Sequence, residues 1–557
     1  MWRERRNMNP VDGPADLILT EARIYTAGRS ARGAESVVLR AGRIVALGPH
    51  QEVDGWIGPG TRVVPLAGRM LVPGFQDAHI HPDGGGLVMA RCSLHGLHGR
   101  DACVEAVRGY AEAHPDVPWI LGGGWSLADF LRGIPHRSLL DDVVPDRPVY
   151  LPNRDGHGAW VNTMALEMAG LTRESPDPPD GRIEREEDGT PSGTLHEGAM
   201  HLVARLIPPP SQGEVESALL TAQSHLHALG ITAWQDAHVT PATLAAYRSL
   251  AERGALTARV IGAFWWDRHR GEEQIEELVE QRRSGATGRF RPTSVKIMQD
   301  GIPENFTAGL LSPYLDSSGC PTSNRGLSFV DPRELDRIVT RLDREGFQVH
   351  VHAIGDRAVR EALDAFEGAL GANGSTDGRH HVAHIQVVHP DDVPRFARLG
   401  VTANAQPFWA CLDRQMRDLC VPHLGEERTG WQYPFAGIVR TGGRLAMGSD
   451  WPVTTPDPLK EIEVAVTRVP HGKEDREPFL SHQRLSLEHA LEAFTAGSAF
   501  VNHLDDRTGT IEAGKLADLA VIDRDLFEID PHDIGQATVV MTLVEGQPVH
   551  IDPQLSW

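Results

Sequence analysis

The sequence predicts an α/β fold whose main body is a (β/α)8 TIM-like barrel. Eight apolar, strand-like segments occur along the chain, and amphipathic helices separate most of the later ones. Such alternation is typical of a parallel sheet with its helices on the outside. The chain has 557 residues, and one hydrophobic core rarely grows beyond roughly 300 residues. We therefore expect accessory units beside the barrel.

Both ends of the chain are expected to form one small β-sandwich. Short apolar runs separated by glycines fill residues 15–71, and the stretch from residue 509 onward repeats this style. Alternating runs with glycine turns indicate antiparallel strands. The expected organisation is the first sandwich part at 1–70, barrel strand one at 71–88, an insertion at 89–212, the barrel remainder at 213–504 and the second sandwich part at 505–557.

The insertion after barrel strand one differs in character from the rest. It is irregular and rich in proline and glycine, and we expect 173–191 to be an exposed loop. Regular periodicity begins after Gly213, with a helix over 214–229 that ends at Gly230. The remaining barrel strands are expected at 230–237, 258–264, 293–299, 347–352, 381–386, 400–405 and 444–450.

Composition and charge narrow the classes of partner. The formal net charge of −22 repels nucleic-acid backbones and anionic membranes, so neither is an expected partner. No window is apolar enough for a membrane span. The charged N-terminus lacks the apolar run of a secretory signal, Met8 is an alternative start, and we expect a cytoplasmic protein. Five scattered cysteines indicate neither disulfides nor a thiolate metal site.

The end of barrel strand one carries the first candidate metal ligands. His79 and His81 are two residues apart, so both imidazoles project from one side of an extended strand. This spacing alone also fits a solvated turn. It gains weight because the chain holds 27 histidines, several within apolar runs where an unpaired imidazole is costly.

Ligand-type residues also mark four later strands, whose C-terminal ends form the usual active-site face of such a barrel. Lys296 lies on strand four, His352 ends strand five, His384 lies on strand six and Asp450 ends strand eight. Each has a plainer interpretation. Lys296 could pair with Asp300, and a lone aspartate such as Asp450 often caps a turn.

Neighbouring histidines compete with two of these candidates. His350 points the same way as His352, but it lies deeper in the strand and is expected to support the site from behind. On strand six only His384 lies within the apolar run, so we expect His381 and His389 at the surface or in loops.

Taken together, these segments resemble the amidohydrolase superfamily, and within it the YtcJ-like amidohydrolase family 3 that includes N-substituted formamide deformylases. The resemblance covers nearly the whole chain. It rests on segments 73–82, 157–162, 191–193 with Glu197, 295–297 with 300–301, 352–358, 384–386, 406–407, 448–450 and 514–518.

The resemblance implies a metal centre and a role for each ligand. His79, His81 and Asp450 would bind one metal, His352 and His384 a second, and a carboxylated Lys296 would bridge the two. Zinc is the expected metal, as one or two ions, although the same ligands also accept manganese, iron or cobalt. The family often pairs its barrels, so a homodimer is also an expectation.

The implied activity is metal-assisted hydrolysis of an amide-type C–N bond in a small molecule, an N-formyl or small N-acyl amine. The metal makes a bound water reactive at neutral pH, and Asp450 takes its proton and hands it to the departing nitrogen. His157 would help to hold the tetrahedral oxyanion. Four further residues are weighed as pocket residues, with a structural role favoured for each: Glu197, Trp125, Gln299 and Gln406.

Two alternatives to this hydrolase stay open. One is deamination of a ring or amidine, but such superfamily members usually lack the bridging lysine and place a glutamate near the histidine of strand five. The other is a scaffold that kept the barrel and lost turnover. All six expected ligand positions hold suitable residue types, which favours an enzyme.

Overall fold

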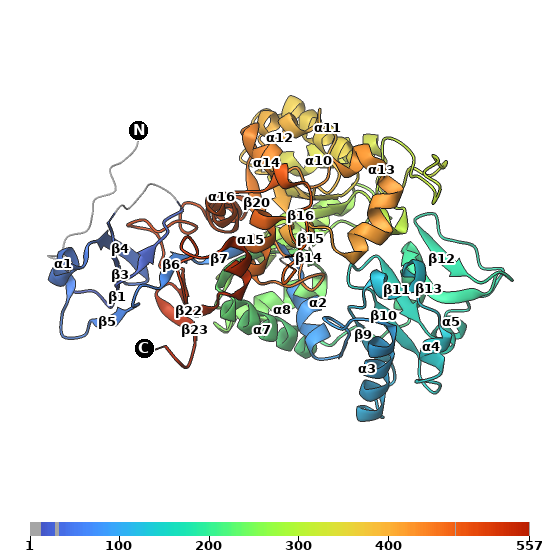
Figure 1. Cartoon of the computed structure of the whole chain (residues 1–557), viewed down its shortest axis with the longest axis horizontal. Coiled ribbons are helices and arrows are strands. Elements are labelled where there is room, and N and C mark those ends of the chain that lie inside the picture. Colours follow the sequence, from blue (N-terminus) through green and yellow to red (C-terminus); the bar gives the residue numbers. More distant parts are fainter. Residues whose placement is uncertain (1–12, 28–32, 474, 556) are drawn as a thin grey trace.

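The computed structural model describes residues 13–27, 33–473, 475–555 and 557. The charged N-terminal segment and the alternative start at Met8 lie outside these residues. Three bodies follow one another along the longest axis, with a β-sandwich at one end, the barrel in the middle and the insertion at the other end (Figure 1). No helix within the described residues is long and apolar enough to cross a bilayer.

The middle body is the predicted parallel barrel. Its sheet has the order β20-β19-β18-β17-β16-β15-β14-β7, and every neighbouring pair is parallel. Each strand follows one of the apolar runs in the sequence, which confirms the predicted fold class. The strands are β7 (Phe75–Ile80), β14 (Ile231–Val239), β15 (Arg259–Trp265), β16 (Phe290–Met298), β17 (Gln348–Ala353), β18 (His381–His384), β19 (Thr402–Ala405) and β20 (Leu445–Met447).

Helices cover the outside of the barrel, and capping residues fix where several of them begin. Ser211 and Glu214 form a capping box before α7, while Asp331 accepts two backbone N–H bonds and Pro332 follows it at the start of α10. The helices are α2 (Pro82–Met89), α7 (Gln212–Ala228), α8 (Pro241–Glu252), α9 (Gln274–Gly285), α10 (Pro332–Arg344), α11 (Asp356–Asn373), α12 (Val393–Leu399), α13 (Val421–Thr429), α14 (Phe435–Arg440), α15 (Pro458–Thr467), α16 (Leu487–Glu492) and α17 (Ser498–Val501).

The barrel closes between β7 and β20 through contacts just beyond the strand ends. The Asp450 N–H donates to the carbonyl of His79 at 2.8 Å, and the Ser449 N–H donates to the Asp77 carboxylate at 3.1 Å. A Cβ at Gly448 would lie 2.4 Å from the His79 backbone nitrogen. Only glycine therefore fits at this position, and the closure brings the backbone of His79 against that of Asp450.

The sandwich joins the two chain ends, as predicted. One sheet, β4-β3-β1-β5, is N-terminal, and the other, β2-β6-β21-β22-β23, combines strands from both ends. Leu19 and Leu39 from the first sheet share a core with Leu519 and Met541 from the second. The elements are β1 (Leu17–Thr20), β2 (Arg23–Ile24), β3 (Ser36–Arg40), β4 (Arg43–Gly48), α1 (His50–Val53), β5 (Arg62–Pro65), β6 (Met70–Pro73), β21 (Leu519–Ile522), β22 (Val539–Val544) and β23 (Gln547–Ile551).

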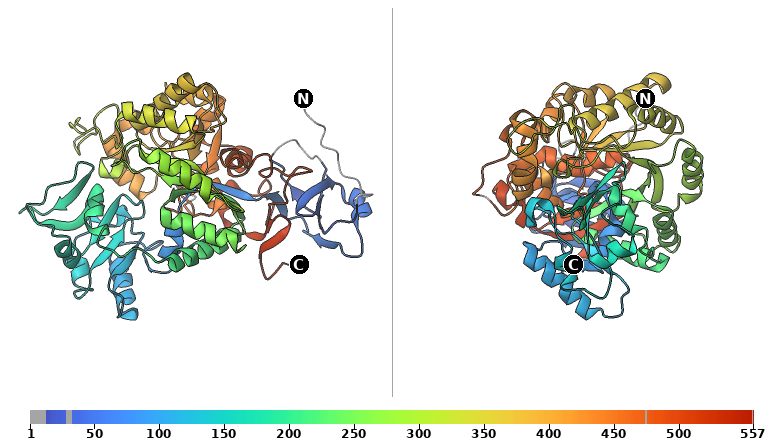
Figure 2. Two further views of the ribbon diagram at one scale, coloured as in Figure 1. Left: turned by 180° about the vertical axis from the view of Figure 1, so that it is seen from behind. Right: turned by 90° about the vertical axis from the view of Figure 1, so that its right-hand side faces the viewer.

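The insertion is more regular than its sequence indicates. It holds a six-stranded sheet of order β12-β13-β11-β10-β9-β8, and β12 lies inside the segment that we expected to be a loop. Viewed along the long axis, it stands in front of the barrel (Figure 2, right). Its elements are β8 (Cys92–Ser93), α3 (Arg100–Ala113), β9 (Ile120–Gly123), α4 (Ser138–Asp141), β10 (Val149–Pro152), β11 (Gly158–Val161), α5 (Thr163–Met168), β12 (Gly181–Arg185), β13 (Pro191–Glu197) and α6 (His201–Ala204).

A buried ion pair ties the barrel to the sandwich. Arg259 at the start of β15 donates to Asp518 at 2.8 Å, and both side chains are almost fully buried. The guanidinium also reaches Glu545, 2.8 Å away, which pairs on its other side with the more exposed Arg289. Removing Arg259 would leave the Asp518 carboxylate buried without its partner.

We expect Arg259→Met to lower the free energy of unfolding by about 3–5 kcal/mol, because one partner of a buried pair is lost. Arg289→Met is the matched control, since it removes a more exposed pair to the same Glu545, and such pairs contribute about 1 kcal/mol or less. Urea unfolding followed by circular dichroism measures both. Equal effects of the two substitutions would contradict the assignment.

Candidate active site

The candidate site is a cavity of about 720 Å³ between the C-terminal ends of the barrel strands and the insertion. Residues from both bodies line it. The insertion contributes Tyr150, Arg154, His157 and Glu197, so it forms the wall opposite the barrel. This is the face at which barrels of this kind carry their active sites.

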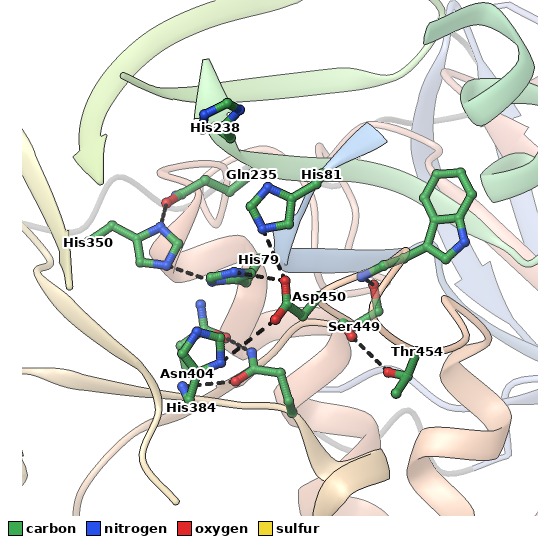
Figure 3. A network of polar contacts seen from close by, with 12 residues as sticks. His79, His81, Gln235, His238, His350, His384, Asn404, Ser449, Asp450 and Thr454 are labelled. Atoms are coloured by element: carbon green, nitrogen blue, oxygen red, sulfur yellow. Dashed lines mark hydrogen bonds and ion pairs between the residues drawn. The ribbon is translucent and has the colours of Figure 1, made fainter. Parts of the chain in front are cut away.

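Two histidines and one carboxylate meet at the floor of this cavity, where β7 and β20 close the barrel. Oδ1 of Asp450 lies 3.2 Å from Nε2 of His79 and 3.0 Å from Nε2 of His81. Figure 3 shows both imidazoles directed at this carboxylate. Asp450 has a φ of 55°, a strained conformation for a residue other than glycine, and such strain is common at functional sites.

His384 and His352 complete a continuous group of imidazoles. Nδ1 of His384 lies 4.0 Å from Oδ2 of Asp450, and its ring centroid is 4.4 Å from that of His352 and 4.8 Å from that of His79. One potential ligand atom from each of His79, His384 and Asp450 lies within 4.8 Å of the others. These ligand candidates come from different strands and converge.

Lys296 is buried on β16 and lines the same cavity. Among the described residues, its amine makes neither a hydrogen bond nor an ion pair. The plainer interpretation, a pair with Asp300, is therefore wrong. Asp300 instead accepts backbone N–H bonds from Gly309, Ile354 and Gly355 at 2.8–3.0 Å, and so holds together the loops beside the site.

Three buried atoms of the candidate ligands lack hydrogen-bond partners. They are Nε2 of His352, Nδ1 of His384 and Oδ1 of Asp450. Their ionisable neighbours are Oδ1 of Asp300 at 3.6 Å, Oδ2 of Asp450 at 4.0 Å and Nε2 of His81 at 3.0 Å, respectively. A buried polar atom without a partner costs free energy, so such atoms call for an explanation. Imidazole nitrogens and a carboxylate oxygen are the donor set that zinc and related divalent metals prefer. The residues at this site therefore fit a divalent metal.

The electrostatics keep these atoms in the protonation states that a metal needs. Burial lowers the pKa of His79 to about 3 and holds the pKa values of His352 and His384 well below their usual range. Burial opposes ionisation of Asp450, but the neighbouring His79 and His81 outweigh it and hold its pKa well below normal. Neutral imidazoles around an ionised carboxylate result.

His157 faces the site from the insertion as one half of a buried pair. Its Nδ1 lies 2.9 Å from Oε2 and 3.0 Å from Oε1 of Glu197, and its ring centroid is 5.5 Å from that of His352. Burial opposes protonation of His157, but the Glu197 carboxylate outweighs it and raises the pKa. Glu197 also accepts a hydrogen bond from Thr307 at 2.7 Å.

Of the four residues weighed as pocket residues, only Glu197 lines the cavity. Trp125 is a core residue whose indole donates to the Leu151 carbonyl at 2.8 Å. Gln299 donates to the Val330 carbonyl and Glu361. Gln406 accepts the backbone N–H of His384 at 2.9 Å, so it supports a candidate ligand from behind.

The expectation that His381 lies at the surface is wrong. It is fully buried at the start of β18, where its Nε2 lies 3.0 Å from Oε1 of Gln235. The inside of the barrel buries it, although no apolar run precedes it in the sequence. His350, by contrast, lies behind His79 as predicted, with its Nε2 2.8 Å from Nδ1 of that histidine.

Sequence reasoning missed His238, which lines the cavity at the end of β14, and Gln235 beneath it. A repeat could have revealed both. The tetrapeptide Gln-Asp-Ala-His occurs at 76–79 and again at 235–238. In both copies the aspartate accepts the backbone N–H of the histidine at 2.9 Å. The two neighbouring strands therefore end in the same local structure.

Comparisons with known proteins identify relatives over nearly the whole chain. A model of the amidohydrolase family matches residues 62–550. Protein LONG AFTER FAR-RED 3 of Arabidopsis thaliana is 32% identical, over 99% of this chain and 94% of that protein. An N-substituted formamide deformylase of Arthrobacter pascens is 26% identical, over 95% of this chain and 97% of that protein.

A solved structure has the same architecture. It is an uncharacterized metal-dependent hydrolase from Pyrococcus furiosus, 28% identical, with a TM-score of 0.70 over 91% of this chain and 99% of that one. The match to the family model spans the barrel, the insertion and the sandwich from β5 onward. The chain belongs to the amidohydrolase family.

Proposed function

We propose that this protein is a metal-dependent hydrolase that cleaves the amide-type C–N bond of an N-formyl or small N-acyl amine. The observation that carries the proposal is the convergence of three buried ligand atoms that make no hydrogen bond, on His352, His384 and Asp450. They lie in a cavity large enough for a small molecule. Zinc is the proposed metal, because these donors suit it.

The proposed ligands are His79, His81, His352, His384 and Asp450, together with Lys296 in its carboxylated form. A metal bound there would acidify a water molecule and polarise the substrate carbonyl. Burial lowers the pKa of Lys296 to about 8. A larger fraction of its amine is then neutral and able to add carbon dioxide, which gives a carbamate anion and a proton.

Asp450 carries the proton during the reaction. Its low pKa keeps it ionised, so it accepts a proton from the attacking water as the bond to the acyl carbon forms. The same proton then passes to the nitrogen, the C–N bond breaks, and the amine leaves. The position of Asp450 between His79 and His81 keeps its carboxylate directed into the cavity.

His157 stabilises the negative charge that develops on the substrate oxygen. Glu197 occupies its Nδ1, so Nε2 is the nitrogen left to donate into the cavity. The raised pKa of His157 favours the doubly protonated form. A positioned cationic donor of this kind is an effective oxyanion stabiliser.

The substrate class rests on two observations. A relative across nearly the whole chain is an N-substituted formamide deformylase, and the presence of a lysine at position 296 supports hydrolysis over deamination by the family pattern. The cavity is also lined by apolar and aromatic side chains that would suit the substituent on nitrogen: Val88, Tyr150, Met200, Trp265, Phe408 and Trp409.

The activity is tested with a panel of N-alkyl and N-aryl formamides and acetamides, with release of the amine measured. We expect turnover by the zinc-loaded protein, loss of turnover after chelation and recovery when zinc is restored. Zinc should also raise the thermal midpoint, because it binds the folded state. Full activity in a preparation shown by mass spectrometry to be free of metal would contradict the proposal.

Lys296→Ala is expected to lower zinc content and turnover together, since it removes the bridging ligand. A short carboxylic acid such as acetate should restore part of both by supplying the missing carboxylate. Lys460→Ala, which removes a more exposed lysine on α15, is the control. Unchanged zinc content in Lys296→Ala would remove this residue from the ligand set.

Asp450→Asn keeps the shape of the side chain but removes its capacity to accept the proton. We expect turnover to fall by about 10²–10⁴-fold, the usual contribution of a positioned general base. Steady-state kinetics at matched zinc content measure the change. Turnover within tenfold of the parent would show that another group carries the proton.

A further inference from the structure

A chain of buried polar side chains fills the barrel interior beneath the candidate metal ligands. It joins residues on β14, β17, β18 and β19, and Figure 3 shows the part that runs from Gln235 through His350 to His79. All of its members are almost fully buried. Each side chain must therefore find its hydrogen-bond partners within the chain itself.

The direction of the hydrogen bonds is anchored on one side by backbone carbonyls. Nε2 of Gln348 donates to the carbonyls of Arg379 at 2.9 Å and Val501 at 2.8 Å. A carbonyl only accepts, so the orientation of the Gln348 amide is fixed. Its Oε1 must face Gln235, whose Nε2 donates to it at 2.9 Å. Oε1 of Gln235 is thereby left as an acceptor.

A second backbone contact, on the other side of the barrel interior, independently shows that Oε1 of Gln235 accepts hydrogen bonds. The backbone N–H of His384 donates to Oε1 of Gln406, so Nε2 of Gln406 donates to Oδ1 of Asn404 at 3.1 Å. Nδ2 of Asn404 then donates to the carbonyl of Ala78 and to Nδ1 of His381, 3.1 Å away. His381 therefore carries its proton on Nε2, which points at Gln235.

Both anchors show that Oε1 of Gln235 is a hydrogen-bond acceptor, and this determines which nitrogen of His79 carries the proton. Oε1 of Gln235 accepts from Nε2 of His381 at 3.0 Å and from Nδ1 of His350 at 2.9 Å. With its proton on Nδ1, His350 presents an Nε2 lone pair to Nδ1 of His79, 2.8 Å away. His79 must donate there, so its own Nε2 lone pair faces Asp450 and the cavity.

We propose that Gln235 is a positioning residue that fixes the tautomer of His79 through His350, so that Nε2 of His79 is free to bind the metal. The inference rests on the proposed function in one respect, the assignment of His79 as a ligand. Nothing in the chemistry of a lone histidine selects this tautomer. The partner of the other ring nitrogen selects it.

The alternative tautomer is unfavourable at the contact between His79 and His350. A proton on Nε2 of His79 could donate to Asp450, but it would occupy the nitrogen that the metal needs and leave two lone pairs facing each other, 2.8 Å apart, between His79 and His350.

The repeated tetrapeptide supplies a matched control. Gln76 occupies the place in the first copy that Gln235 occupies in the second. It is equally buried, and its amide bonds to Thr508 at 2.8 Å and Asn502 at 3.3 Å rather than to a histidine. Gln76→Met and Gln235→Met thus remove the same group from the same barrel interior, but only Gln235 bonds directly to His350, the histidine that contacts His79.

The experiment measures the zinc dissociation constant of each variant by competition with a chromophoric chelator. We expect Gln235→Met to raise it about 10–100-fold, as losses of such supporting partners do, and Gln76→Met to leave it near the parent value. Gln235→Glu should restore binding. Its buried carboxyl stays neutral, so the carbonyl oxygen still accepts both histidine protons and the hydroxyl donates to Gln348.

Three results would overturn the proposal: unchanged affinity in Gln235→Met, equal losses in both methionine variants, or failure of Gln235→Glu to restore binding. Neutron diffraction of the metal-free parent tests the tautomers even if a variant does not fold. Deuterium on Nδ1 of His79 and His350 is expected, and deuterium on Nε2 of His79 alone would contradict the proposal. If the parent binds no zinc, the proposed function is wrong. Neutron diffraction still decides the tautomers of His79 and His350 independently of that result.

Discussion

The structure depends on one unfavourable arrangement, a buried carboxylate packed against a group of imidazoles. Asp450 lies within 3.2 Å of two imidazole nitrogens, and nitrogens of His352 and His384 that make no hydrogen bond are buried beside the same cavity. Such a group is costly to bury in a folded protein unless a cation joins it. The surrounding fold must therefore hold these side chains in place at the expense of its own stability.

The neighbouring backbone shows how they are held. His384 and Asp450 both adopt positive φ, at 78° and 55°, so neither side chain is where an ordinary strand would place it. Asp77 accepts the backbone N–H groups of His79 and Ser449, and Gly448 allows the first and last strands to approach each other. On the other side of the cavity Glu197, with a φ of 51°, fixes His157. The ligands and the groups that would contact the substrate are thus positioned by different bodies of the molecule.

Much of this arrangement could be predicted because barrel strands leave a strong signal. A segment such as β17 alternates valines with His350 and His352, so both the strand and the ligand candidate are visible in the sequence. The sheet of the insertion was not predictable, since strands such as β12 are short and bury a single residue, Ile183. Gln235 and His381 look like surface residues, and only closure of the barrel brings them together. Trp125 lies in a glycine-rich run that is typical of a pocket, yet its indole belongs to the core.

This cluster of side chains is arranged to hold a metal, and anomalous diffraction from a crystal grown with zinc and bicarbonate tests that role. We expect strong anomalous density among His79, His81, His352, His384 and Asp450, with additional density continuous with the amine of Lys296. A zinc-soaked crystal with no anomalous density at these residues, and an unmodified lysine, would contradict it.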